Sequence, residues 1–337
     1  MTQDDSSQDE SEILSSPCPE CGEANIQPLH IKVSRAGHGL SPDKRATFCF
    51  NCGFIVEEKG PDYSPPVTMP NVKEPSEYTQ CEYTHDISDE NVFDDIDSEE
   101  WDCVHPAEEG HDYCIFHALA EEKDTERVSQ RFIKAVNRGY SYEDVDIPVE
   151  ERLRFFGAEF GEFSFEDVVL DPSTESDICI DLRDVNAGGG IYWSGEINCG
   201  VLLSGSSIGR LSTYSTIYGD LEVREARIRM VGFEGANIEG DLDFTGSEIS
   251  GKTSREEVGR GPREYKSVKV SIACEAVSVQ GTVSLASSEV SGSVRIHTWD
   301  IEDGLDLRDA EFDLGITIEA TVGDDVNMNN VVVRDRN

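Results

Sequence analysis

A repeating unit of 10 to 11 residues runs through the second half of the chain and restricts its fold more than any other feature. The unit is clearest between residues 219 and 251, where apolar or small side chains fall in pairs two residues apart, with a step of three or four to the next pair. The pairs are Leu221 and Val223, Ala226 and Ile228, Val231 and Phe233, Ala236 and Ile238, Leu242 and Phe244, and Ser247 and Ile249. Residues two apart point to one face of a strand and a step of three changes the face, so the chain must turn a corner between pairs. Two units would then form one four-sided coil of about 21 residues.

The same phase is visible from residue 201 and, after an interruption at 252–269, again from residue 272. Such coils cannot bury their inner faces alone, so they stack, and each adds a layer of parallel β-ladder about 4.8 Å thick. Gly recurs near the unit ends and Pro262 is the only Pro after residue 172, which suits short strands with tight corners. The sequence therefore predicts a mainly β protein with a C-terminal β-solenoid over 156–337. The alternative is a β-sandwich, whose alternation can also look periodic.

Units such as Ala236-Asn-Ile-Glu-Gly followed by Asp-Leu-Asp-Phe-Thr resemble those of the pentapeptide-repeat family. The resemblance covers roughly residues 156 to 333. It implies a right-handed, four-sided β-helix in which small residues and Leu or Phe point inward.

Two Cys-x-x-Cys knuckles, each followed by Gly, predict a first metal site within a module at 17–59. The candidate ligands are Cys18, Cys21, Cys49 and Cys52. Two such knuckles suit tetrahedral Zn²⁺, and the segment between them leaves room for a β-hairpin, as in the zinc ribbons that this segment resembles. Four thiolates leave no open coordination position, so we expect a structural site; disulfide-bonded or free thiols are the alternative.

A second metal module is predicted at 81–120, with Cys81, Cys103, Cys114 and His117 as ligands of a second Zn²⁺. Cys114 and His117 have the spacing of a ligand pair. His105 in place of Cys81, or a metal-free cluster of buried cysteines, are the alternatives. The closing Tyr113-Cys-Ile-Phe-His also resembles a Cys/His module found before the repeats in some pentapeptide-repeat proteins. No Glu stands beside a His ligand to serve as a general base, which argues against hydrolysis at the metal.

The remaining segments are assigned by composition and periodicity. Residues 1–16 read as a disordered acidic tail, and the five prolines of 60–80 indicate a semi-extended linker. A helix is predicted at 124–138 within a helical connector at 121–155, with an apolar stripe of Val128, Phe132, Ala135 and Val136. We expect this helix to pack on the second metal module or to cover the open first coil.

The chain is strongly acidic, with 69 acidic against 28 basic residues and a formal charge of -41. Acidity spread over the whole chain is typical of halophilic archaeal proteins, because molar salt screens the self-repulsion. Mimicry of the charge of DNA is the alternative. The sequence has no 18-residue apolar run and no charged-then-apolar leader, so we expect no membrane contact and a cytoplasmic location.

Two short segments are locally basic and are candidate partner-binding sites. Lys32, Arg35, Lys44 and Arg45 lie between the knuckles and could contact nucleic acid. The interruption at 252–269 is predicted to project as a loop, with Arg255, Arg260, Arg263 and Lys266 available to a partner. A solvated hairpin and a tolerated insertion are the simpler interpretations of the two segments.

These features favour a non-enzymatic zinc-binding scaffold or adaptor that binds proteins. No nucleophile motif or phosphate-binding loop occurs, and His297 is the only His of the solenoid. One alternative is a DNA-mimicking inhibitor of a type II topoisomerase, a function that the resemblance implies because some pentapeptide-repeat proteins are acidic rods of this kind. A self-assembling structural solenoid is another. The open edge of the last coil also suggests a homodimer formed through the C-terminal coil.

Overall fold

The computed structural model describes the second half of the chain almost completely and the first half in part. The described residues are 26–31, 44–49, 55–58, 78–88, 92–93, 95–96, 98–119, 123–138, 142, 145, 147–172, 178–258 and 264–334, with backbone only for 26–31, 44–49, 55–58, 252–258 and 264–268. Cys18, Cys21, Cys52, Lys32, Arg35, Arg260 and Arg263 lie outside these residues. The acidic tail and the Pro-rich linker also fall outside them, apart from residues 78–80.

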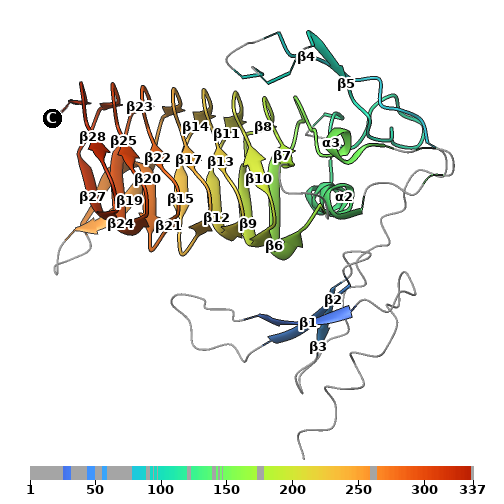
Figure 1. Cartoon of the computed structure of the whole chain (residues 1–337), viewed down its shortest axis with the longest axis horizontal. Coiled ribbons are helices and arrows are strands. Elements are labelled where there is room, and N and C mark those ends of the chain that lie inside the picture. Colours follow the sequence, from blue (N-terminus) through green and yellow to red (C-terminus); the bar gives the residue numbers. More distant parts are fainter. Residues whose placement is uncertain are drawn as a thin grey trace, which may run out of the picture.

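The C-terminal region is a parallel β-solenoid of about seven turns, which confirms the predicted fold class (Figure 1). One seven-stranded sheet consists of β7 (Cys179–Asp181), β10 (Gly200–Leu202), β13 (Leu221–Glu222), β17 (Leu242–Asp243), β22 (Val283–Ser284), β25 (Leu305–Asp306) and β28 (Val326–Asn327). A second consists of β8 (Asn186–Ala187), β11 (Ser207–Ile208), β14 (Arg227–Ile228), β18 (Glu248–Ile249), β23 (Glu289–Val290), β26 (Glu311–Phe312) and β29 (Val332–Val333). The third, ten-stranded sheet holds β6 (Glu162–Leu170), β9 (Gly190–Ile197), β12 (Leu211–Ile217), β15 (Val231–Phe233), β16 (Asn237–Ile238), β19 (Lys252–Val258), β20 (Glu264–Glu275), β21 (Ser278–Val279), β24 (Ser293–Ile301) and β27 (Ile316–Val322).

The third sheet occupies two of the four sides expected from the repeat. Where the corner is kept, the two sides are separate strands, as in β15 and β16. In β12 the buried residues Leu211, Thr213, Ser215 and Ile217 instead follow one another in steps of two. Without the step of three there is no change of face, so one continuous strand replaces two sides and the corner between them.

The inward positions predicted from the repeat form the solenoid core. Leu221 pairs with Leu242, which pairs with Val283, and all three are buried. Each coil turns the corner between the first and second sheets at a residue with φ between 53° and 73°. These residues are Asp184, Gly205, Glu225, Gly246, Ser287, Asp309 and Asn330. Gly219, one of the glycines that recur near the unit ends, is required by close packing between coils and not by a positive φ. A Cβ on Gly219 would lie 2.7 Å from the backbone nitrogen of Gly200 in the previous coil.

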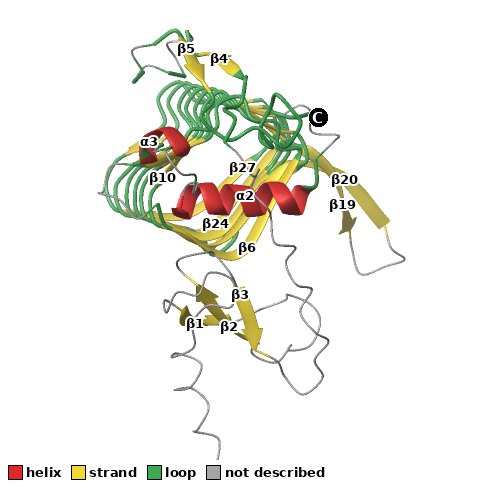
Figure 2. Ribbon diagram, turned by 90° about the vertical axis from the view of Figure 1, so that its right-hand side faces the viewer, coloured by secondary structure: helices red, strands yellow, loops and turns green. Residues whose placement is uncertain are grey.

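Helix α2 (Thr125–Arg138) covers the N-terminal end of the solenoid, as one of the two sequence expectations had it (Figures 1 and 2). Its buried Phe132 packs against Phe163 of β6, with ring centroids 4.7 Å apart. Asn137 also joins α2 to the first coil: its Nδ2 donates to the Val169 carbonyl at 2.9 Å, and its Oδ1 accepts from the Asp171 amide at 2.8 Å. A short helix, α3 (Val149–Arg152), follows and leads into the first coil, residues 153–170.

The interruption at 252–269 is a β-hairpin rather than the loop predicted from its sequence. β19 pairs antiparallel with β20 from Lys252–Val270 to Val258–Glu264, and the pair projects from the side of the solenoid (Figure 2). The second half of β20 then rejoins the coil, where Ile272 pairs with Val231. A β-hairpin satisfies its own backbone hydrogen bonds, so it can extend from the third sheet without disturbing the stack.

Two smaller sheets precede the solenoid. β1 (Ile26–Ile31), β2 (Lys44–Cys49) and β3 (Ile55–Glu58) form a three-stranded antiparallel sheet, which includes the hairpin expected between the knuckles. Whether this module is a zinc ribbon stays a prediction, because three of its four thiols lie outside the described residues. β4 (Thr84–Asp86) pairs antiparallel with β5 (Glu100–Asp102). Among the described residues, no helix has the length and apolar character needed to cross a membrane.

Candidate metal centre

Four predicted ligands of the second module come together in one buried cluster. Cys81, Cys103, Cys114 and His117 each place a ligand atom within 4.8 Å of all the others. The pairing of β4 with β5 brings Cys81 and Cys103, which flank these strands, to one end of the pair. A tight turn then presents the last two ligands, because the amides of His117 and Ala118 both donate to the Cys114 carbonyl, at 3.1 and 3.0 Å.

The spacing of the ligand atoms fits a tetrahedral ion. Cys103 Sγ lies 3.8 Å from Cys114 Sγ, and His117 Nδ1 lies 3.2 Å from Cys114 Sγ and 3.7 Å from Cys81 Sγ. A Zn–S bond of about 2.3 Å in a tetrahedron implies sulfur atoms about 3.8 Å apart. The Cys114 amide also donates to Cys81 Sγ at 3.2 Å, a contact that stabilises a thiolate. The cluster could therefore hold a metal ion.

The tautomer of His117 is fixed by the first coil of the solenoid. Its Nε2 lies 2.9 Å from the Phe156 carbonyl oxygen, which can only accept, so Nε2 carries the proton. Nδ1 then presents its lone pair to the Sγ atoms of Cys114 and Cys81. Such a backbone partner on the second ring nitrogen is usual for metal-ligating histidines.

The three thiols cannot all ionise in this site without a cation. Hydrogen bonds from Cys103 and Cys114 lower the pKa of the Cys81 thiol, whereas burial raises the pKa values of Cys103 and Cys114. On its own the cluster favours a single thiolate supported by two thiols. A divalent cation would supply the charge that three thiolates need, as thiolate ligation of metals requires.

Aromatic side chains close the cluster off from water on one side. The Tyr83 ring stacks on the His117 ring with centroids 3.9 Å apart, and Trp101 meets the same ring edge-on at 6.3 Å. Tyr83 Oη is in turn 2.9 Å from His85 Nδ1. Gly157 of the first coil makes room for this pair, since a Cβ there would lie within 2.7 Å of His85 Nδ1 and closer still to Tyr83 Oη.

A buried arginine of the solenoid joins the module to the rod. Arg183 donates from Nη1 to the Val92 carbonyl at 2.9 Å and forms ion pairs with Asp95 and, at 2.6 Å, with Asp181. Its guanidinium also lies over the Phe93 ring, 5.0 Å from the centroid. The module is therefore packed onto the solenoid as a cap. Sequence reasoning missed Arg183, Tyr83 and His85, and the only local signal was the closeness of Tyr83 and His85 to Cys81.

His105, the alternative ligand, belongs to the interface with the first coil and not to the cluster. Its Nε2 is 2.9 Å from the Arg154 carbonyl oxygen, and its ring stacks on Phe155 with centroids 4.6 Å apart. Burial lowers the pKa of His105 to about 3, so the ring is neutral.

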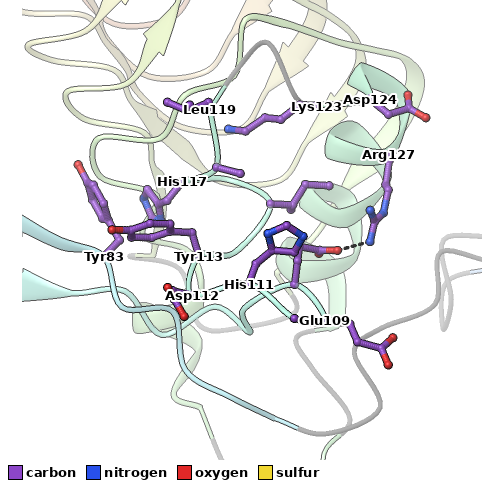
Figure 3. A pocket seen from close by; sticks show the side chains of 14 residues that line it. Tyr83, Glu109, His111, Asp112, Tyr113, His117, Leu119, Lys123, Asp124 and Arg127 are labelled. Atoms are coloured by element: carbon purple, nitrogen blue, oxygen red, sulfur yellow. Dashed lines mark hydrogen bonds and ion pairs between the residues drawn. The ribbon is translucent and has the colours of Figure 1, made fainter.

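An open cavity of about 810 Å³ lies beside the candidate metal centre (Figure 3). His117 is the one residue of the cluster that lines it, together with Tyr83 and Tyr113. Lys123 also lines the cavity, and its ammonium group donates hydrogen bonds to the carbonyls of Phe116 and Glu159. The charged side chains around the cavity are thus partly engaged in holding the cap to α2 and the first coil.

The other predicted site residues that the structure describes lie on strands outside the cluster. Cys49 lies at the end of β2, and Lys44 and Arg45 lie on the same strand, where the backbone alone is described. Arg255 and Lys266 lie on the two strands of the projecting hairpin, where again only the backbone is described.

Comparison with protein-family models, with curated proteins and with solved structures finds no significant match to this chain.

Proposed function

We propose that this chain is a non-enzymatic scaffold, a β-solenoid of pentapeptide-repeat type whose N-terminal end is closed by a zinc-bound cap and whose surfaces bind protein partners. One observation carries the proposal: the buried cluster of Cys81, Cys103, Cys114 and His117 is anchored to the first coil through the hydrogen bond from His117 Nε2 to the Phe156 carbonyl.

The ligand set supports a structural role for the ion. Four protein ligands complete the tetrahedral coordination that Zn²⁺ prefers and leave no position for water or substrate. Zinc sites that catalyse keep such a position open. Reduced thiols in a metal site also suit the reducing cytoplasm rather than an oxidising compartment.

The architecture supports a scaffold. The Cys/His module is too small to fold on a core of its own, and metal binding would supply folding free energy to hold it on the rod. The cap in turn protects the exposed strand edges of the first coil, as terminal repeats do in other solenoids. Stacked coils then present long, flat lateral faces to partners.

Cobalt substitution tests the closed site. The full chain loaded with Co²⁺ is expected to show the strong visible absorption of a tetrahedral thiolate complex, and added azide or cyanide should leave the spectrum unchanged. Cys103→Ser should bind one equivalent of metal fewer than the wild type, whereas Cys199→Ser, a change of another buried cysteine, should bind the same amount. A spectrum that responds to the added anion would reveal an open position and contradict a purely structural ion.

Capture of partners from native lysate in molar KCl tests the scaffold itself. The wild type is compared with a Cys18→Ser, Cys114→Ser double variant and with a chain lacking the projecting hairpin. We expect a protein that re-forms a defined complex from purified components and that is lost with one of the two variants, which identifies the two N-terminal modules or the hairpin as the contact. If no variant differs from the wild type and no complex re-forms, the adaptor proposal fails.

A further inference from the structure

The open cavity beside the candidate metal centre exposes two large apolar side chains. Tyr113 is 46% exposed and Leu119 is 65% exposed, and both line the cavity of about 810 Å³. A volume of this size lies within the range of about 300 to 1,000 Å³ that is usual for ligand sites. Apolar side chains that stay exposed in a hollow with polar surroundings mark a surface where another molecule binds.

The wall that carries Tyr113 is a turn held by its own backbone hydrogen bonds. The Glu108 amide donates to the Tyr113 carbonyl at 3.0 Å, and Ala107 forms an antiparallel bridge with Cys114. The His111 amide donates to the Glu108 carbonyl at 2.9 Å, which closes the turn. Tyr113 is therefore presented by a preformed loop, so a ligand would bind it without the cost of ordering the backbone.

The cationic side chains of the cavity are already engaged by the protein. Lys123 donates to two main-chain carbonyls, and Arg127 forms an ion pair with Glu108. A second arginine, Arg131, lies 3.5 Å from the other carboxylate oxygen of Glu108. These contacts leave neither Lys123 nor Arg127 as a free counter-ion for an anionic ligand.

Two carboxylates of the same cavity are available instead. Glu109 and Asp112 are exposed, and their carboxylates form no hydrogen bond or ion pair within the part of the chain that the structure describes. Figure 3 shows them on one side of the cavity, with Leu119 on the other side and Tyr113 between. The available charge is thus negative and lies beside an aromatic ring, whose face attracts cations.

We infer that this cavity binds an extended segment of a protein partner in which a Lys or Arg side chain stands next to an apolar one. The cation would pair with Asp112 or Glu109 beside the Tyr113 ring, and the apolar side chain would contact Leu119. Charge complementarity selects this class of partner, because a nucleic acid or an acidic peptide would meet unpaired carboxylates. The inference rests on the scaffold function proposed above and names the kind of partner and its site.

Selection of short random peptides displayed on phage against the immobilised full chain tests the inference. We expect the enriched peptides to carry Lys or Arg next to Leu, Ile, Phe or Met. One such peptide is then titrated with the chain by fluorescence anisotropy. Glu109→Lys combined with Asp112→Lys should weaken its binding by at least about 10-fold, because like charges would face one another. Tyr113→Ala should weaken it by about 5-fold through loss of the cation–π contact.

Glu302→Lys combined with Asp303→Lys is the matched control. These exposed residues lie between β24 and β25, and the pair changes the net charge of the chain by the same amount. The control should bind the peptide as the wild type does. All these side chains are exposed, so the far-ultraviolet circular dichroism of each variant should match that of the wild type.

Several outcomes would overturn the inference. These are enrichment of acidic peptides, no enrichment, or equal weakening by the two double variants. A wild type that self-associates and loses this association in the Glu109 and Asp112 variant would assign the cavity to a second copy of the chain. If a protein partner captured from lysate bound that variant as tightly as the wild type, this site would be wrong while the scaffold function would stand.

Discussion

At the scale of single residues, the candidate metal centre depends on atoms that do not ligate. The carbonyl of Phe156 selects the tautomer of His117, and the ring of Tyr83 holds the imidazole plane. Hydrogen-bond and stacking partners of this kind orient the ligands of most metal sites. The local sequence identified the four residues of the cluster, because Cys and His at metal-binding spacing are a chemical signal. It could not identify the carbonyl or the tyrosine, since neither residue type is specific to metal sites.

Gly157→Ala tests this support directly. The substitution places a Cβ into Tyr83 Oη and His85 Nδ1 at a residue with φ of 63°, so we expect it to displace Tyr83 from His117 and to cost about 2 to 4 kcal/mol of unfolding free energy. Gly110→Ala is the control, because it has φ of 79° but open space around its Cβ, and should cost only about 1 kcal/mol. Denaturant unfolding of both variants measures the difference. Equal losses would show that the clash is absent and that Tyr83 does not depend on Gly157.

At the scale of elements, the repeat predicted the coils more accurately than the connections between them. Inward residues could be identified from sequence because burial imposes the same step on every coil. Two sides of the coil merge in β12 because one step of three residues between buried positions is missing. The hairpin of β19 and β20 forms by strand pairing within an insertion, and the insertion does not carry the repeat from which its structure could be predicted. The contact of Arg183 with Val92 joins residues 91 apart in the chain, and no periodicity reports such a distance.

Helix α2 gives a prediction at the same scale. Phe132 is fully buried between α2 and the aromatic rings of the first coil, so Phe132→Ala should leave a cavity and cost about 3 to 5 kcal/mol. Because α2 protects the strand edges of the first coil, the variant should also aggregate at lower temperature than the wild type. Thr125→Ala, at an exposed position of the same helix, should change the unfolding free energy by less than about 1 kcal/mol. Thermal unfolding followed by light scattering measures both effects, and a Phe132 variant as stable and as soluble as the control would show that the helix does not cap the rod.

At the scale of the whole molecule, parallel stacking turns the acidity of the chain into a structural problem. In a parallel solenoid each outward residue lies beside its equivalents in the coils before and after it. Glu248 pairs with Glu289, and Glu289 pairs with Glu311, so three carboxylates form a ladder along the second sheet. Like charges directly opposite one another destabilise a sheet. The Debye length falls from about 10 Å at 0.1 M salt to about 3 Å at 1 M, which is shorter than the separation between coils.

Glu289→Gln therefore separates charge repulsion from every other effect of salt. Glu289 is the middle member of the ladder. Among the described contacts, Arg334 forms an ion pair with Glu311 and not with Glu289. Removing its charge should raise the unfolding free energy by about 0.5 to 1 kcal/mol at about 0.1 M KCl, and by close to zero at about 3 M KCl, where screening already removes the repulsion. Glu196→Gln is the control, because this exposed carboxylate lies between Thr216 and Val169 and has no acidic neighbour in its ladder. Thermal or urea unfolding of the three proteins at both salt concentrations gives the comparison. If the gain of Glu289→Gln persisted at high salt, or if Glu196→Gln gave the same gain, repulsion along the ladder would not be a source of salt-dependent stability.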